Sequence, residues 1–470
     1  MSLPNELGSS KPHCIVIGGG FAGITAAVRL TEANWKVTLI EARERPGGRV
    51  LSLKDSATGE IIDNGQHLMM GCYEDTLRLL ATLNTTHILR RQRALRVWFA
   101  ERLSSQEHNT SFCLDASLLP GKFGVALGMM RLQGLSWQEK MYLLYFASRL
   151  QLNLVKPFGK TSAELLREER QSERVIQRLW EPIILATLNT SVAQSSAVLF
   201  VEVMRLAFLG GSEASQMLIA ETGLDAVLEP ASEWLHNRGS TFLTGIVQTL
   251  CVTDDYVSGV KLKTGEVLEA DAVISAVPLP ILAKLLPSEL HRTAQLPNVS
   301  LFPTSPILSV YLWFDKEFVE QDFVALLGTN VQWVFNRRKL CQAETSVTER
   351  FPCHLSLTVS AADVWAGASS EEIIRHCTEE LCTVFPLART ANLLHARVMR
   401  EKNATPLFTP VNEHLRPNAQ TPLKGLFLAG DWTNTGLPAT IESASRSGVL
   451  AAHAVARSHN QSVGASVVGT

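Results

Sequence analysis

Three glycines and one glutamate near the N-terminus have the residue types and the spacing needed to bind a dinucleotide. Gly18, Gly20 and Gly23 form a GxGxxG pattern, and Glu41 follows them. In this pattern the first glycine permits a tight turn, the second lets the backbone approach a pyrophosphate, and the third lets a helix pack closely on the preceding strand. An acidic residue roughly 20 positions further on accepts hydrogen bonds from ribose hydroxyls.

The elements that must position these residues can be read on either side of them. The apolar run 14–17 has the length of a buried parallel strand, a helix follows the glycines, and residues 37–40 form the next strand. The first turn of that helix presents free N–H groups to phosphates. The alternative is a glycine turn in a βαβ unit without a ligand, but strand, helix, strand and acid together favour a dinucleotide site.

Length and composition limit the possible classes of function. A chain of 470 residues is long enough for two intertwined domains with sizeable cores. The formal net charge is −2 and no basic block occurs, which argues against a nucleic-acid partner. Eight cysteines are scattered without a CxxC pair or zinc spacing. Reduced thiols in a cytoplasmic setting and no metal site are therefore expected.

Hydropathy gives two further expectations. Residues 1–11 are short and polar, so they do not supply a secretory signal, and no apolar run of about 18 residues predicts a membrane-spanning helix. However, 46% of the residues are hydrophobic, which is high for a soluble enzyme. Such a composition indicates apolar surface reserved for a long apolar ligand or for a bilayer face.

Several segments resemble those of the flavoprotein superfamily that includes amine oxidases and carotenoid desaturases. Glu41 is followed by Arg43 and by the turn Gly47-Gly48-Arg49, an extension that NAD enzymes do not usually carry. In the superfamily this turn lies against the FAD phosphates and the flavin. The segments DNGQH, LATLNT and GDWTNTGLPATIE are most similar to the hydroxysqualene dehydroxylases, and the resemblance extends over residues 13–457.

The resemblance and the periodicity together predict an α/β fold, in which a Rossmann-like FAD-binding domain is interleaved with an α+β substrate domain. Apolar residues recur at helical spacing through five stretches, and three later stretches alternate as strands of an antiparallel sheet. The predicted parts are FAD-binding segments 12–110, 213–280 and 416–460, a helical insert at 111–212 and a substrate domain at 281–415. The predicted helices of the insert are 122–132, 136–154, 162–169, 172–186 and 195–209, and the predicted strands are 303–314, 331–336 and 354–361.

The resemblance also implies cofactor contacts at the C-terminal end of the chain. Val247 would offer a backbone contact to adenine, and Gly430-Asp431 would end a buried strand so that Asp431 accepts hydrogen bonds from ribityl or ribose hydroxyls. Pro438 is expected to open a long helix whose N–H groups at Thr440 and Ile441 face the flavin. Because no cysteine follows Cys382, non-covalent FAD is expected.

The implied reaction is the reduction of an allylic alcohol, hydroxysqualene, to squalene on a bacterial route to hopanoids or related triterpenes. Functional coupling to squalene-pathway synthases would follow. Such a reaction needs a general acid that protonates the departing hydroxyl and a hydride from reduced flavin. His67, Asp63 and Glu442 are the candidate acids, and a histidine can exchange protons near neutral pH. His67 is ranked first because an imidazole on this loop could reach the substrate, whereas Asp63 is expected to hold backbone N–H groups of the loop and Glu442 the N-terminus of its own helix. In the alternative, all three residues have structural roles, and a bound water or the flavin itself transfers the proton.

Two other functions stay open, namely a carotenoid or other polyene desaturase, which runs the hydride in the opposite direction, and a non-catalytic lipid-binding flavoprotein. Residues 122–156 mix Met129, Met130 and Leu135 with interleaved lysines and arginines. Such a helix pair is suited to the anionic inner face of the cytoplasmic membrane, where a peripheral protein would meet a long apolar isoprenoid substrate. The alternative is an ordinary pair of core helices.

Overall fold

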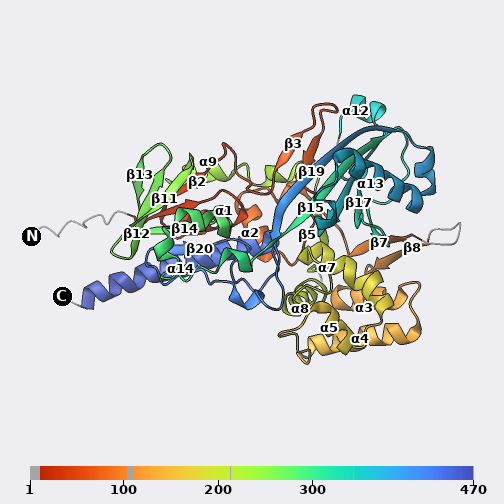
Figure 1. The fold of residues 1–470 in the computed structure, drawn as a ribbon, viewed down its shortest axis with the longest axis horizontal. Helices are drawn as coiled ribbons and strands as arrows, with labels where there is room; N and C mark the ends of the chain where they lie inside the picture. The colour runs from red at the N-terminus through yellow and green to blue at the C-terminus, as the bar shows by residue number, and fades with distance from the viewer. Residues whose placement is uncertain (1–10, 103–109, 212, 342, 469–470) are drawn as a thin grey trace, which may run out of the picture.

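A five-stranded parallel sheet organises the FAD-binding half of the molecule (Figure 1). The computed structural model describes residues 11–102, 110–211, 213–341 and 343–468, so the expectation about a secretory signal falls almost wholly outside the described residues. The carboxyl ends of parallel strands meet at one edge of a sheet, where ligands bind. In their order across the sheet, the strands are β10 (Thr241–Thr244), β2 (Lys36–Glu41), β1 (His13–Ile17), β14 (Ala272–Ser275) and β20 (Leu426–Leu428).

Helices cover this sheet. Helix α1 (Phe21–Glu32) follows the glycine turn, and α14 (Ile441–Val468) packs along it. The two backbones approach so closely that a Cβ added to Gly448 would lie 2.3 Å from the carbonyl oxygen of Ala22. Helix α2 (Glu74–Thr82) packs against α14 as well. Glycine at position 448 therefore allows the close packing of α14 on α1.

A small antiparallel sheet extends the FAD-binding half. It contains β11 (Val247–Thr253), β12 (Tyr256–Leu262) and β13 (Val267–Glu269). Strand β10 ends at Thr244, and Val247, to which the resemblance assigns a contact with adenine, is the first residue of β11. Two further small sheets are the two-stranded β3–β4 and the three-stranded β5–β9–β6. Their strands are β3 (Ser52–Lys54), β4 (Ile61–Asp63), β5 (Met69–Met70), β6 (Leu89–Arg91) and β9 (Met217–Ala220).

A seven-stranded sheet forms the centre of the substrate domain. It is antiparallel except where β16 pairs with β7, so it is mixed rather than purely antiparallel. Strands β7 and β8 come from residues that the sequence assigns to the first FAD-binding segment and the insert, which moves that boundary to before Arg96. The order is β19 (Leu393–Pro406), β15 (Thr304–Phe314), β18 (Cys353–Ser360), β17 (Trp333–Asn336), β16 (Phe323–Leu327), β7 (Arg96–Glu101) and β8 (Thr110–Asp115). Helix α13 (Ser370–Val384) belongs to the same domain.

The helical insert forms a separate lobe below the seven-stranded sheet in Figure 1. Two of the predicted helices are interrupted by single π-helical turns at Ile176–Trp180 and Met204–Phe208, which the periodicity did not predict. Capping boxes at Ser136 and Thr161 start two of the helices. The α-helical segments are α3 (Gly121–Arg131), α4 (Trp137–Gln151), α5 (Ser162–Glu168), α6 (Glu173–Val175), α7 (Glu181–Leu188) and α8 (Ala197–Val203).

The apolar residues of the insert divide between core and surface differently from the sequence prediction. Met129 is buried in the main hydrophobic cluster, and Leu135 packs against that cluster. By contrast, Phe123, Trp137 and Met141 are exposed. Within the described part of the chain, no helix has both the length and the apolar character required to cross a bilayer.

Candidate active site

The glycine turn after β1 leaves room for a ligand at one position only. A Cβ added to Gly23 would lie 1.8 Å from the carbonyl oxygen of Gly18, so close helix packing requires glycine there. Gly20 differs, because the nearest protein atom to an added Cβ is the Cα of Gly48 at 3.7 Å. The turn is therefore packed beneath Gly23 and open beside Gly20, as a site for a pyrophosphate requires.

The second glycine pair packs directly on this turn. The N–H of Gly47 donates to the carbonyl oxygen of Gly19 at 2.8 Å, and the guanidinium of Arg43 donates to the carbonyl of Gly48 at 3.1 Å. The Glu41 carboxylate accepts hydrogen bonds from the N–H groups of Gly19 at 2.6 Å and Arg43 at 3.1 Å. Glu41 thus holds both loops together at the end of β2, where a ribose hydroxyl would reach it.

An ion pair joins the beginning and the end of the chain at this edge. Arg49 donates to the carboxylate of Asp431 at 2.6 Å, and Asp431 raises the pKa of Arg49. A second nitrogen of Arg49 donates to the carbonyl of Ala404 in β19 at 2.8 Å. The N–H of Gly430 donates to Ser447 at 2.7 Å. The predicted residues Arg49, Gly430 and Asp431 are therefore brought together between the two domains.

Arg416 is a residue of this site that the sequence analysis missed. Its buried guanidinium donates to the carbonyl oxygens of Leu437 at 2.7 Å, Asp431 at 3.2 Å and Thr433. Burial lowers the pKa of Arg416 to about 10, which leaves it charged at neutral pH. One side chain thus holds the loop that leads from β20 to α14. No motif surrounds Arg416 in the sequence, so its role becomes visible only from the fold.

Helix α14 begins three residues later than predicted. Pro438 precedes the helix, and the hydroxyl of Thr440 caps it by accepting the N–H of Ser443 at 3.2 Å, so that Ile441 is the first helical residue. Thr440 and Ile441 therefore lie at the positive end of the helix dipole, as expected. A helix N-terminus stabilises a nearby negative charge, such as that of reduced flavin, by about 0.3 to 2 kcal/mol.

Glu442, one of the candidate acids, is hydrogen-bonded to the neighbouring helix α2. Its side chain is 2% exposed, and its carboxylate accepts the N–H groups of Asp75 and Thr76, both at 3.0 Å, and the Thr76 hydroxyl at 2.8 Å. Burial raises the pKa of Glu442, and the hydrogen bonds from Thr76 and Asp75 oppose that rise. Glu442 caps the N-terminus of α2 rather than that of its own helix.

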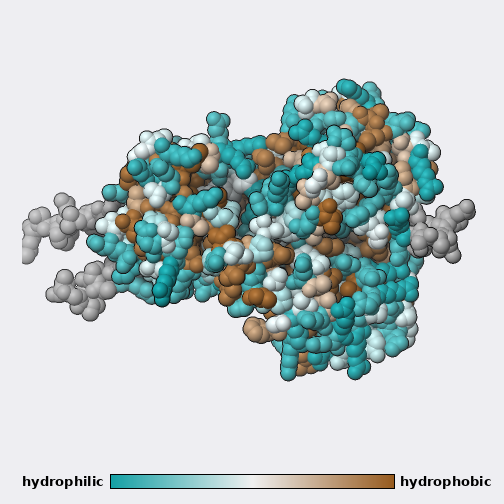
Figure 2. Space-filling view, viewed as in Figure 1, coloured by the Kyte–Doolittle hydropathy of each residue, from teal (hydrophilic) through white to brown (hydrophobic). Residues whose placement is uncertain are grey.

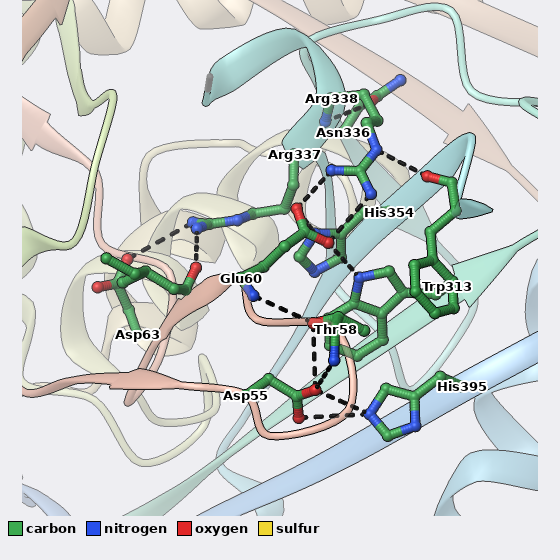
Figure 3. Close-up of polar contacts among 12 residues, drawn as sticks. Asp55, Thr58, Glu60, Asp63, Trp313, Asn336, Arg337, Arg338, His354 and His395 are labelled. Atoms are coloured by element: carbon green, nitrogen blue, oxygen red, sulfur yellow. Dashed lines mark hydrogen bonds and ion pairs between the residues drawn. The ribbon is translucent and has the colours of Figure 1, made fainter. Parts of the chain in front are cut away.

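Asp63, the second candidate, is also fully engaged. Its carboxylate accepts the Ser52 hydroxyl at 2.7 Å and the N–H of Leu224 at 2.9 Å, and it lies 3.6 Å from the buried guanidinium of Arg337. The Tyr311 hydroxyl donates to the carbonyl of Asp63 at 2.8 Å. Figure 3 shows Asp63 and Arg337 facing one another at the end of the β3–β4 hairpin. These contacts hold the loop that follows.

His67 retains an unused polar atom. Its Nδ1 is buried and has no hydrogen-bond partner among the described residues. Removal from water lowers the pKa of His67, Asp63 and the backbone of Gly65 oppose that fall, and the Arg49 charge lowers the pKa further. The imidazole is therefore neutral at pH 7 and lies within the electrostatic reach of Arg49. Of the three candidates, His67 is the one with a buried polar side-chain atom that has no hydrogen-bond partner among the described residues.

A buried polar cluster anchors the hairpin that carries this loop (Figure 3). Glu60 accepts hydrogen bonds from Arg338 and, at 2.6 Å, from the indole of Trp313, with His354 at 3.4 Å. Burial raises the pKa of Glu60, but hydrogen bonds from His354 and Arg338 hold it well below its ordinary value. Burial lowers the pKa of His354 to about 4. The anchor is thus a charged Glu60 with a neutral His354, and the sequence analysis predicted neither.

Comparison with known proteins agrees with this assembly. The family model for flavin-containing amine oxidoreductases matches residues 21–456. The chain belongs to this family. Hydroxysqualene dehydroxylases from Sinorhizobium fredii and Rhodopseudomonas palustris are each 30% identical, over 93% and 94% of this chain and 96% and 97% of theirs. A 15-cis-phytoene desaturase from an Oncidium hybrid is 26% identical over 99% of this chain and 81% of its own.

Family membership makes the chain an FAD-dependent oxidoreductase and confirms the predicted cofactor. Among solved structures, cyclohexylamine oxidase from Brevibacterium oxydans superimposes with a TM-score of 0.69 at 17% identity, covering 96% of this chain and all of that one. That likeness confirms the predicted α/β fold class. The relatives at 30% identity confirm the resemblance to hydroxysqualene dehydroxylases.

We expect the FAD to be released by acid precipitation, because no cysteine is suited to a covalent bond. The charge of Glu442, near the start of α14, acts on Cys72. Burial raises the pKa of Cys72 to about 12, so its side chain stays a protonated thiol. The measurement is the absorbance of the supernatant after trichloroacetic acid treatment. Yellow colour retained in the washed pellet would contradict the prediction.

Proposed function

We propose that the protein catalyses the FAD-dependent reductive dehydroxylation of hydroxysqualene to squalene. The observation that carries this proposal is the 30% identity, over nearly the whole length of both chains, to relatives named hydroxysqualene dehydroxylase. An enzyme that makes this alcohol must supply the substrate, so functional coupling to squalene-pathway synthases is part of the proposal. We further propose that the squalene formed enters a bacterial route to hopanoids or related triterpenes.

Some residues of the site would bind the cofactor, and others would take part in the reaction. Bound FAD supplies the hydride chemistry. Gly18, Gly20 and Gly23 would hold its pyrophosphate, and Glu41 would hold its ribose. The reaction exchanges a carbon–oxygen bond for a carbon–hydrogen bond, so the hydroxyl must gain one proton to leave as water. His67 is the group that we assign to this proton, since Asp63 and Glu442 already bond to the protein.

A polyene desaturase is the second candidate, because the 15-cis-phytoene desaturases are 24–26% identical to the chain over at least 94% of its length. The two functions differ in the direction of hydride transfer. Incubating the protein with hydroxysqualene and dithionite, and separately with 15-cis-phytoene and a quinone, distinguishes them by product analysis. Squalene from the first mixture is expected. Phytofluene from the second mixture, without squalene from the first, would refute the proposal.

The exposed side of the helical insert supports membrane contact for a substrate that does not dissolve in water. Trp137, Met141 and Tyr145 are exposed at intervals of four residues along one face of α4, opposite the buried Leu143 and Phe146. Residues 111–212 contain 11 Lys and Arg against 8 Asp and Glu, a formal charge of +3, in a chain of charge −2. On the face drawn in Figure 2 this lobe is largely hydrophilic. A basic lobe with an apolar helix face would attach peripherally to an anionic bilayer at the inner face of the cytoplasmic membrane.

We expect liposome binding to depend on the exposed apolar side chains rather than on Met129 and Leu135. Replacing Phe123, Trp137 and Met141 together by serine should move most of the protein from the pellet to the supernatant. The measurement is co-sedimentation with vesicles that contain an anionic lipid, compared with vesicles that contain only neutral lipid. Equal recovery of wild type in the supernatant with and without anionic lipid would refute membrane association.

The matched control replaces three exposed apolar residues of the substrate domain and its neighbouring loops by serine. Val364, Leu387 and Val411 are 80%, 66% and 73% exposed. This triple variant should sediment with anionic vesicles as wild type does. Equal losses of binding in the two triple variants would assign the effect to general surface hydrophobicity and overturn the assignment to α4.

A further inference from the structure

Two buried polar atoms without partners lie in one row of the substrate-domain sheet. Thr358 in β18 pairs directly with Ser309 in β15 on one side and with Trp333 in β17 on the other. Directly paired residues of antiparallel strands point to the same face of a sheet. The Thr358 hydroxyl and the Trp333 indole nitrogen are both buried, and neither has a hydrogen-bond partner among the described residues.

This row lies beside the His67 loop. A Cβ added to Gly65 would lie 3.4 Å from the Ser309 hydroxyl and 3.8 Å from Cε1 of His67, so Ser309 and His67 lie on the same side of Gly65. The loop is held there because Tyr311, two residues along β15 and on the same face, bonds to the backbone of Asp63 at 2.8 and 3.2 Å. Arg49 acts electrostatically on His67. The row therefore adjoins the loop that carries the candidate acid His67.

The surroundings of the row are apolar. The rings of Phe323 and Phe335 lie 6.2 and 6.3 Å from Trp333, and all three belong to the main hydrophobic cluster. An unpaired polar atom in such surroundings costs free energy, and natural proteins nearly always pair it with water or a ligand. An indole N–H can only donate, whereas a threonine hydroxyl can donate or accept. Together, the indole N–H can donate a hydrogen bond to an alcohol oxygen, and the threonine hydroxyl can donate to the same oxygen or accept from its O–H.

We propose that Thr358 and Trp333 bind the single hydroxyl group of a long isoprenoid alcohol and fix the carbon that reacts. This inference rests on the proposed function. The substrate's allylic C–O bond breaks, its carbon gains a hydride from reduced FAD, and its oxygen gains a proton and leaves as water. Donation from the Trp333 N–H and the Thr358 hydroxyl stabilises the negative charge that develops on that oxygen. A hydrocarbon lacks the oxygen and leaves the row unpaired, so the row distinguishes substrate from product.

The test compares an alcohol with a hydrocarbon of the same length. Thr358→Val removes the hydroxyl and keeps the shape, and Trp333→Phe is the second variant should the first not fold. Purified oxidised protein with bound FAD is titrated with hydroxysqualene and with squalene, and the dissociation constants are read from changes in flavin absorbance. We expect Thr358→Val to weaken binding of the alcohol about 5- to 10-fold and binding of squalene less than about 2-fold.

Thr25→Val is the matched control, because Thr25 in α1 is also buried and its hydroxyl also lacks a partner among the described residues. It should change neither constant. Equal changes for alcohol and hydrocarbon in Thr358→Val, or no change for either, would overturn the inference. Failure of the proposed function is a separate result, in which wild-type protein forms no squalene. An active enzyme with an unaltered binding ratio in Thr358→Val and Trp333→Phe would refute only the hydroxyl site.

Discussion

Replacing Gly20 by valine is expected to abolish FAD binding while the protein still folds. The nearest protein atom to a Cβ at this position is the Cα of Gly48 at 3.7 Å, an ordinary van der Waals contact, so a Cβ here fits without a clash between protein atoms. The space beside Gly20 is the one in which the backbone must approach the pyrophosphate. The Gly20→Val protein should be purified colourless and should not regain a flavin spectrum when excess FAD is added.

Two comparisons keep this prediction specific. Gly367→Val, at a position where an added Cβ meets nothing within 4 Å, should bind FAD as wild type does. Gly23→Val should not fold at all, because its Cβ would lie 1.8 Å from the carbonyl oxygen of Gly18. Circular dichroism reports folding and flavin absorbance reports binding. Wild-type flavin content in Gly20→Val would contradict the pyrophosphate assignment.

Replacing His67 by glutamine is expected to slow hydride transfer about 100-fold or more without loss of FAD or substrate. His67 has a buried ring nitrogen without a partner among the described residues, whereas Asp63 and Glu442 are engaged by neighbouring N–H and hydroxyl groups. Glutamine keeps the capacity to hydrogen-bond but does not exchange a proton near neutral pH. Stopped-flow reoxidation of the reduced protein by hydroxysqualene measures the rate constant.

The pH dependence gives an independent check. The pKa of His67 is lowered, so its protonated form, the acid, is populated only below the ordinary value of about 6.5. The rate constant should therefore rise as the pH falls through the lowered pKa and level off below it. His67→Gln should lose this rise. A wild-type rate in His67→Gln, or the same pH profile in both proteins, would remove His67 from the proton transfer.

The parts of the site that lie close together in the sequence could be predicted from it. Gly18, Gly20, Gly23 and Glu41 follow from local geometry, because a strand, a turn and a helix in this order leave few alternatives. The resemblance to flavoproteins extended this to Asp431 and the start of α14. The helix start was placed at Pro438 instead of Ile441, because proline marks the approach to a helix without specifying which hydroxyl caps it.

The parts that depend on long-range packing could not be predicted. Arg416 and Arg337 are buried arginines whose partners are backbone carbonyls and side chains far along the chain, and neither lies in a recognisable motif. Helices α3 and α4 carry both buried and exposed apolar residues, so periodicity alone could not separate core residues such as Met129 from exposed ones such as Phe123 and Trp137. Edge strand β19 has mostly half-buried and exposed positions, which gives a weak pattern.

A single-turnover reaction tests the central claim most directly. The protein is reduced anaerobically by light, freed of excess donor and mixed with one equivalent of hydroxysqualene, and flavin absorbance is followed while the products are extracted. The proposed function predicts reoxidation of the flavin with one squalene formed per flavin oxidised. Flavin that stays reduced with hydroxysqualene bound, or oxidised flavin that becomes reduced when squalene or a carotenoid precursor is added, would contradict it.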